Sequence, residues 1–204
     1  MGDRRHYSEA DVVEAAKHVF WERGYTGTAI DHLQAATGLS RSSLYLAFGT
    51  KRAVFDAALT QYVASFVDPR LGPLEAAGAG LREAAAYFRS LARYFTRPDA
   101  ARGCLYINSI LELAGRDASF TPAATDFTNR VRDAFGNALG NAAADGTMDS
   151  TRLTQRTAML TAALFGAWVD VRSDAAAAAG ACHEIAKEVT SWRLKVAPVE
   201  TPRR

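Results

Sequence analysis

The sequence predicts an all-α protein of about nine helices, and three observations point to this class. Hydrophobic residues make up 49% of the chain and charged residues 23%, which is a globular composition. Apolar residues recur at three- and four-residue spacing along most of the chain. No stretch shows the sustained Val, Ile and Thr alternation of a half-buried strand, so we expect no sheet.

The N-terminal part is predicted to form three short helices and a longer one. Ser8 is a candidate N-cap for the first helix, and Gly24 and Gly38 are candidate ends of the first two. Gly49 separates the third helix from the fourth. The four predicted helices span residues 8–24, 28–38, 40–47 and 51–66.

The rest of the chain is predicted to form a larger helical domain. The segment Asp68–Pro73 contains two prolines and a glycine in six residues, so we interpret it as a linker. An alanine-rich run at 174–180 can extend either of its neighbouring helices. The predicted helices span 74–96, 101–114, 121–144, 151–172 and 181–196. These boundaries predict two domains, 1–66 and 67–204.

Charge and cysteine content limit the classes of function that the chain can have. The net charge is +2 in 204 residues, and residues 1–60 hold as many acidic as basic side chains. This balance argues against a DNA-binding protein without sequence preference, which needs a wide basic surface. Two cysteines make no disulfide framework, the N-terminus lacks the apolar core of a signal peptide, and the most apolar segment, 158–169, is too short to span a bilayer. We therefore expect a soluble cytoplasmic protein.

The segment ATGLSRSSLYLAFGTK, residues 36–51, has the pattern helix, glycine turn, short second helix. This is the helix-turn-helix pattern, whose second helix lies in the major groove of DNA. Arg41, Ser42 and Ser43 would reach the base edges first. Tyr45 would face outward with its hydroxyl free for a phosphate, and the helix starts near Thr28 and Lys51 favour phosphate as well. The candidate DNA-binding residues are Thr28, Ser40, Arg41, Ser42, Ser43, Tyr45, Thr50 and Lys51.

Spacing alone leaves a second interpretation open, because glycine-turned helix pairs are common. In that case the segment is a tight helical corner whose serines only cap a helix. Residues 24–59, GYTGTAIDHLQAATGLSRSSLYLAFGTKRAVFDAAL, favour the first interpretation because they resemble the N-terminal signature of TetR-family transcriptional regulators. The matching features are Phe20, Gly24-Tyr25, Thr28, Ile30, Gly38-Leu39-Ser40, Leu44-Tyr45, Phe48 and Lys51.

Two positions depart from the pattern of that family. Ser42 stands where glycine is frequent and adds a potential base contact. Leu46 and Ala47 stand where many relatives have polar or histidine side chains, so a contact is lost there or is replaced by apolar contact with a thymine methyl. Specificity is therefore expected to depend mainly on Arg41, Ser42 and Ser43.

The resemblance also implies a homodimer that represses by binding a palindromic operator. The last two helices of the chain, 151–172 and 181–196, would pair with those of a second subunit. Activation in place of repression stays open, because promoter geometry decides between them. Leu160, Leu164, Gly166-Ala167 and Trp168 on the first helix, with Ile185, Val189 and Trp192 on the second, would build this interface. The alternative is that these stripes pack within one chain, which periodicity does not distinguish.

By analogy with the family, release from DNA would follow binding of a small apolar or amphipathic effector among the middle helices. Most aromatic residues there are expected to be ordinary core. An apolar cavity with a few convergent polar groups is the usual form of a small-molecule site. The candidate ligand-binding residues are Phe88, Phe95, Tyr106, Asn108, Ile110, Phe127, Val131 and Trp168.

Cys104 supports an alternative form of regulation. It lies beside Arg102 at the start of a predicted helix, where the pKa of a thiol can be lowered. The Gly-Cys-Leu segment, with Asn108 and Glu112-Leu113 after it, resembles one in a TetR subgroup, some members of which sense electrophiles through such a cysteine. The competing interpretation is a buried packing residue.

An enzyme is the main rival from another class, and the sequence does not favour it. Cys182 and His183 are adjacent, but neighbours on a helix point about 100° apart and form no nucleophile–base pair. The remaining histidines pair with no cysteine or carboxylate at metal-ligand spacing. We expect no metal site, no cofactor and no catalysis.

Overall fold

The computed structural model describes residues 8–194. The helices in that range confirm the predicted all-α class. A π-helical segment, Val63–Val67, joins α4 to α5 without a break, so the described residues form nine continuous helices as predicted. Pro98–Arg102 and Ser150–Arg152 form short 3-10 turns. The helices are α1 Glu9–Arg23, α2 Ile30–Thr37, α3 Arg41–Phe48, α4 Lys51–Tyr62, α5 Asp68–Glu75, α6 Leu81–Phe95, α7 Leu105–Leu113, α8 Thr121–Ala144, α9 Leu153–Asp170 and α10 Ala175–Ser191.

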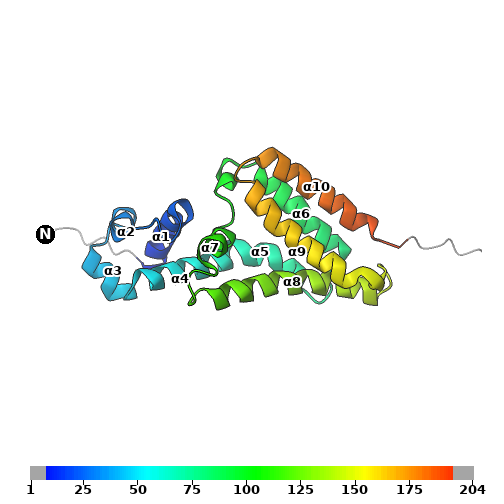
Figure 1. Cartoon of the computed structure of the whole chain (residues 1–204), viewed down its shortest axis with the longest axis horizontal. Helices are drawn as coiled ribbons and strands as arrows, with labels where there is room; N and C mark the ends of the chain where they lie inside the picture. The colour runs from blue at the N-terminus through cyan, green and yellow to red at the C-terminus, as the bar shows by residue number, and fades with distance from the viewer. Residues whose placement is uncertain (1–7, 195–204) are drawn as a thin grey trace, which may run out of the picture.

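The described chain is elongated, with α1, α2 and α3 gathered at one end (Figure 1). We call these three helices the head. The continuous helix α4–α5 runs from the head into a body in which α8 lies along it and α6, α9 and α10 form a tilted layer. Helix α7 lies between the head and the tilted layer and contacts both α1 and α4.

The head is held together by a small apolar core. Helices α2 and α3 have eight residues each, a length at which an isolated helix is marginal in water. Each buries one leucine, Leu33 and Leu44, against side chains of α1 and α4 such as Phe20 and Phe55. The rings of Phe20 and Phe55 meet edge to face at 5.1 Å. Packing of α2 and α3 against α1 and α4 therefore supplies the stability that these short helices lack on their own.

Polar caps fix where the helices begin. Ser8, Ser40, Thr50 and Asp174 each accept a hydrogen bond from the backbone amide three residues on. This cap satisfies an amide that the helix itself leaves unpaired. The alanine-rich run belongs to α10, because Asp174 caps that helix and Ala175 begins it. Residues 195–196 of the last predicted helix lie outside the described residues.

The interpretation of Asp68–Pro73 as a linker is wrong, because this segment lies in α5. Pro69 follows the π-helical segment by two residues and Pro73 lies inside α5, so both prolines stand within the continuous helix. Leu71 and Leu74 are completely buried, so the segment contributes to the core. Asp68 and Glu75 both pair with Arg130 of α8 at 2.7 Å, which ties α5 to the body.

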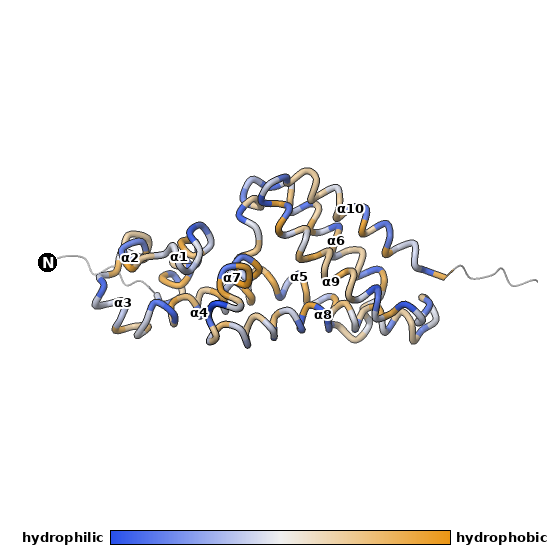
Figure 2. Tube along the Cα trace, viewed as in Figure 1, coloured by the Kyte–Doolittle hydropathy of each residue, from blue (hydrophilic) through white to orange (hydrophobic). Residues whose placement is uncertain are grey.

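Most of the residues expected at the subunit interface pack inside a single chain. Of the expected set, Gly166 is exposed and Ile185 is half-buried. The buried members are Leu160, Leu164, Ala167, Trp168, Val189 and Trp192, which corrects their expected role at the interface. The opposite face of α9 carries apolar residues too: Met159 is 47% exposed and Val169 44%. In the hydropathy view, α9 is pale to orange over most of its length, whereas α10 has blue stretches toward its C-terminal end (Figure 2). Among residues 8–194, no helix combines the length and apolarity that crossing a membrane requires.

Candidate nucleic-acid interface and effector cavity

The turn between α2 and α3 presents the first residues of α3 to solvent. Gly38 adopts φ +71°, the left-handed conformation that glycine accepts most readily, and it ends α2. Ser40 then caps α3 by accepting the amide of Ser43 at 3.1 Å. Because Leu44 is buried against the head, Arg41, Ser42 and Ser43 remain exposed on the opposite side.

The outward face of α3 carries both polar and apolar groups. The Arg41 guanidinium lies 5.6 Å from the centre of the Tyr45 ring. Leu46 is 90% exposed, the highest value for a large hydrophobic residue within residues 8–194. Ser40 Oγ lies 2.9 Å from the hydroxyls of both Ser42 and Ser43. The face therefore offers one cation, three serine hydroxyls, the Tyr45 side chain and the apolar side chain of Leu46 to a binding partner.

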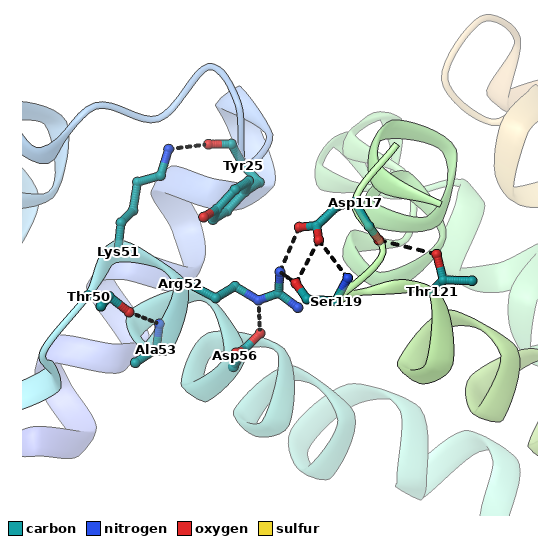
Figure 3. Close-up of polar contacts among 9 residues, drawn as sticks. All are labelled: Tyr25, Thr50, Lys51, Arg52, Ala53, Asp56, Asp117, Ser119 and Thr121. Carbon is teal, nitrogen blue, oxygen red and sulfur yellow. Dashed lines mark hydrogen bonds and ion pairs between the residues drawn. The ribbon is translucent and has the colours of Figure 1, made fainter. Parts of the chain in front are cut away.

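Two of the expected phosphate contacts have structural roles. Thr28 is 1% exposed and its hydroxyl donates to the Gly24 carbonyl at 2.6 Å, so its burial argues against a phosphate contact through that hydroxyl. Lys51 Nζ donates to the carbonyls of Tyr25 and Thr28, both at 2.9 Å, and lies 4.3 Å from the centre of the Tyr25 ring. Figure 3 shows Lys51 reaching from the start of α4 to Tyr25, in the turn between α1 and α2. The Thr50 hydroxyl caps α4 by accepting the backbone amide of Ala53.

Arg52 joins α4 to the body. Its guanidinium pairs with Asp117 at 2.7 Å and donates to Ser119 at 2.9 Å, in the turn between α7 and α8 (Figure 3). It also pairs with Asp56 one turn further along α4 at 2.7 Å. Arg52 and Ser119 both lower the pKa of Asp117. These contacts fix the start of α4 against the α7–α8 turn.

Glu112 of α7 is a second connection between the body and the head. Its carboxylate accepts the backbone amides of Tyr25 and Thr26 at 2.9 and 2.6 Å, in the turn between α1 and α2. Gly24, with φ +70°, stands so close that a Cβ there would lie 2.6 Å from Glu112 Oε2. Trp21 adds a further link by donating to the Gly103 carbonyl at 3.0 Å.

The body contains a small enclosed cavity of about 20 Å³, lined by the π-helical segment, α5, α6, α8, α9 and the start of α7. Its wall is mostly aromatic and aliphatic, with one charged residue, Arg70. Three expected ligand-binding residues, Phe127, Val131 and Trp168, lie in this wall. Sequence reasoning missed Phe66, Arg70 and Tyr87 there; the linker interpretation of 68–73 removed Arg70 from consideration.

The other expected ligand-binding residues lie elsewhere. Phe88 stacks on Phe135 at 5.7 Å, and Phe95 packs edge to face on Trp168 at 5.0 Å. Tyr106 borders a separate pocket of about 530 Å³ between α4 and the start of α8. Asn108 bonds to Arg102 and Arg172, and Ile110 is partly buried against the core. The structure thus divides the expected set among the cavity, the core and two surface sites.

Of the two interpretations of Cys104, the structure favours the buried packing residue over the thiol with a lowered pKa. The thiol is 3% exposed and faces the cavity, and burial raises its pKa. Arg102 does not activate the thiol, because its guanidinium lies over the Trp21 ring at 4.7 Å. Cys104 therefore has the packing character of most free cysteines. Within residues 8–194, no three His, Cys, Asp or Glu side chains gather closely enough to hold a metal ion.

Comparison with known sequences agrees with the geometry of the head. The family described as "Bacterial regulatory proteins, tetR family" matches residues 12–58. The HTH-type transcriptional regulator YezE of Bacillus subtilis is 30% identical over 135 residues, covering 66% of this chain and 70% of the relative. The HTH-type transcriptional repressor ComR of Escherichia coli is 32% identical over 104 residues, half of each chain.

Solved structures share the fold over nearly the whole chain. A cysteine mutant of the TetR-family regulator CifR, solved with a 26-bp operator duplex, superposes with a TM-score of 0.78 at 24% identity, covering 94% of this chain and all of that one. Reduced NemR of Escherichia coli gives 0.76 at 18% identity, covering 92% and 97%. At these identities the likeness concerns the fold alone.

Proposed function

Because this chain belongs to the TetR family of bacterial regulatory proteins, we propose that it is a repressor that binds a palindromic operator as a homodimer and releases it when a small apolar or amphipathic molecule enters the body. The chain is a DNA-binding transcriptional regulator and not an enzyme. Repression, dimerisation and effector release are the steps that the proposal adds.

The exposed start of α3 is the observation that carries the proposal. A recognition helix places its N-terminal residues against base edges. Arg41 can bind guanine through two hydrogen bonds, and the hydroxyls of Ser42 and Ser43 can donate or accept at either base type. The exposed Leu46 offers apolar contact to a thymine methyl. Ser40, Tyr45 and Thr50 complete the surface as phosphate contacts.

A dimer follows from the small size of this recognition surface. One eight-residue helix reads only a few base pairs, whereas a two-fold dimer reads two half-sites about one helical turn apart. We place the interface on α9 and α10, on the faces that a single chain leaves exposed. The proposed domain boundary near residue 66 then falls within the continuous helix α4–α5. The head and α4 form the N-terminal domain, and the rest of the chain forms the C-terminal one.

The cavity is placed where an effector could move the head. Arg70 and Leu71 in its wall belong to α5, which continues into α4 and therefore to Lys51 and Arg52. Cys104 and Ile107 come from the start of α7, which also carries Glu112. An effector that binds more tightly to an opened cavity would shift both connections at once. Only such a difference in affinity between the two states can displace DNA.

Selection of the purified protein against randomised DNA duplexes, at low and at physiological salt, tests the proposal. A palindromic motif that survives the higher salt is expected, because phosphate contacts weaken with salt while base contacts keep the preference. Binding that disappears as salt rises, with no enriched motif, would leave only phosphate attraction and contradict the proposal.

Arg41→Ala is the matched variant for this selection. It should relax the preference at one position of each half-site and cost about 1–3 kcal/mol of discrimination. Arg132→Ala is a suitable control, because Arg132 is exposed on α8 in the body and its side chain bonds to Asn129 of the same helix. An equal loss of affinity for all sequences in Arg41→Ala would show that Arg41 contacts phosphate and not a base.

A further inference from the structure

Arg70 is a charged residue inside an otherwise aromatic part of the body. Its guanidinium lies 3.7 Å from the centre of the Phe66 ring and 5.2 Å from that of Tyr94. The side chain is half-buried and lines the enclosed cavity beside Tyr87 and Cys104. A charge in such surroundings is normally balanced by a carboxylate, because leaving water is costly for an ion.

Arg70 has no such partner among the described residues, since no carboxylate oxygen lies within 4.0 Å of it. Its single hydrogen bond to the protein there is donated to the Phe66 carbonyl at 2.7 Å. A guanidinium has five N–H donors, so most remain for another acceptor. The arginines that tie the body together differ: Arg52 and Arg130 each pair with two carboxylates.

Arg70 also lines a surface groove of about 650 Å³ between α5 and α6. Arg70 and Tyr87 belong to the walls of both the groove and the enclosed cavity, so these two side chains stand between them. The groove is basic, with Arg70, Arg82 and Arg93 against Glu83. Glu83 is already engaged, because its carboxylate accepts the Gly80 amide and pairs with Arg82.

We propose that Arg70 is the head-group site of the effector, and that the effector is an amphipathic organic anion such as a carboxylate or sulfonate with an apolar body. The anionic group binds the Arg70 guanidinium at the inner end of the groove. The apolar body occupies the cavity lined by Phe66, Phe127 and Trp168. This inference rests on the proposed effector release and gives the chemical class of the molecule.

The cavity is too small to hold the apolar body without widening. About 20 Å³ holds little more than one water molecule, whereas small-molecule sites measure about 300–1,000 Å³. An apolar body therefore enters only if Arg70 and Tyr87 move apart and the cavity widens. An anion gives Arg70 a stronger partner than the Phe66 carbonyl and stabilises the widened state.

Two fluorescent probes of similar shape separate the contributions of charge and apolarity. Anilinonaphthalene sulfonate carries a sulfonate on an aromatic body, and N-phenylnaphthylamine is a similar aromatic body without charge. Fluorescence titration of the full-length protein gives a Kd for each probe. We expect the anionic probe to bind roughly tenfold more tightly than the neutral one, the usual scale of a charge-assisted contact.

Variants of Arg70 locate that difference. Arg70→Met keeps an apolar stem of similar length, so we expect it to weaken the anionic probe roughly tenfold and to leave the neutral probe within about twofold. Arg70→Lys keeps the charge and should retain part of the anion preference. Arg89→Met is the control, because Arg89 lies on α6 but lines neither the groove nor the cavity. Circular dichroism and operator binding show that each variant is folded.

The outcomes distinguish this inference from the proposed function. Equal binding of both probes, unchanged in Arg70→Met, would overturn the anion site but keep an apolar effector site. Binding of neither probe would overturn both the anion site and the ligand cavity, while the DNA selection is tested separately. Anionic binding that Arg89→Met weakens as much as Arg70→Met would show a diffuse charge effect and overturn the site.

Discussion

Glu112 is the residue on which the position of the head depends most directly. The backbone amides of Tyr25 and Thr26 lie in a turn and have no helical partner, and the Glu112 carboxylate accepts both. Hydrogen bonds to a charged acceptor are about twice as strong as neutral ones. A glycine at position 24 leaves room for this approach, since any Cβ there would collide with the carboxylate.

Replacing Glu112 with alanine should therefore destabilise the protein and weaken operator binding together. We expect a loss of about 2 kcal/mol in the free energy of unfolding, because two amides lose a charged acceptor. Urea unfolding and an operator titration measure the two effects. Glu184→Ala is the control, since Glu184 forms only an exposed pair with Lys187. Full operator affinity in folded Glu112→Ala would show that this turn does not position α3.

Cys182 gives a prediction about alkaline pH. Burial raises its pKa to about 12, from 9.0 for a free thiol. Above pH 9 the unfolded chain releases this proton while the folded chain keeps it, so stability falls as pH rises from about 9 toward 12. Between pH 8 and pH 10, the wild type should lose ~1 kcal/mol more than Cys182→Ala.

Urea unfolding of both proteins at the two pH values measures that difference. The packing loss caused by Cys182→Ala is present at both values and cancels in the comparison. The ionisation of Cys104 and of the buried tyrosines, whose pKa values are also raised by burial, is common to both proteins. Equal losses of stability in the two proteins would mean that the Cys182 thiol ionises as freely in the folded chain as in the unfolded one.

At the scale of elements, local signals predict helix ends better than tertiary roles. Serine and threonine caps and left-handed glycines act within four residues, so sequence alone located α1, α2 and α3 and the exposed start of α3. The two prolines in residues 68–73 wrongly indicated a linker. Both prolines lie within the continuous helix α4–α5, and the burial of Leu71 and Leu74 packs this segment into the core. That burial depends on α8, which local sequence does not report.

The same limit applies to the candidate site. Periodicity shows that Leu160, Leu164 and Trp168 share a face, but both faces of α9 are apolar, so it does not show which one meets the chain's own core. The role of Lys51 is another example, because its carbonyl partners, Tyr25 and Thr28, lie more than twenty residues away. Contacts over this separation are not reported by the sequence near Lys51.

Substituting Gly72 with alanine tests the helical state of α5. A Cβ at position 72 meets nothing within 4 Å, so in a helix the change should raise the free energy of unfolding by about 0.5–1 kcal/mol. Gly146→Ala is the matched control: its Cβ would also meet nothing, but its φ of +75° makes alanine unfavourable. Thermal or urea unfolding should show opposite signs. Destabilisation by Gly72→Ala would contradict a helix at this position.

At the scale of the whole molecule, the dimer proposed above would form through the face of α9 that the chain leaves exposed. Met159, Ala162, Gly166 and Val169 recur on this face at helical spacing, and all are exposed. Small and apolar residues of this kind allow close helix packing between subunits. A two-fold pairing there would set a fixed distance between the two α3 helices, which an operator with two half-sites requires.

Ala162→Arg should therefore convert a dimer into a monomer of 22.0 kDa, because a charge at the centre of an apolar interface loses its water without gaining a partner. Sedimentation velocity measures the mass, and operator titration should show a large loss of affinity with each half-site bound separately. Thr125→Arg, on an exposed part of α8, adds the same charge away from this face and should change neither result. A dimeric Ala162→Arg protein with full operator affinity would place the interface elsewhere on the body.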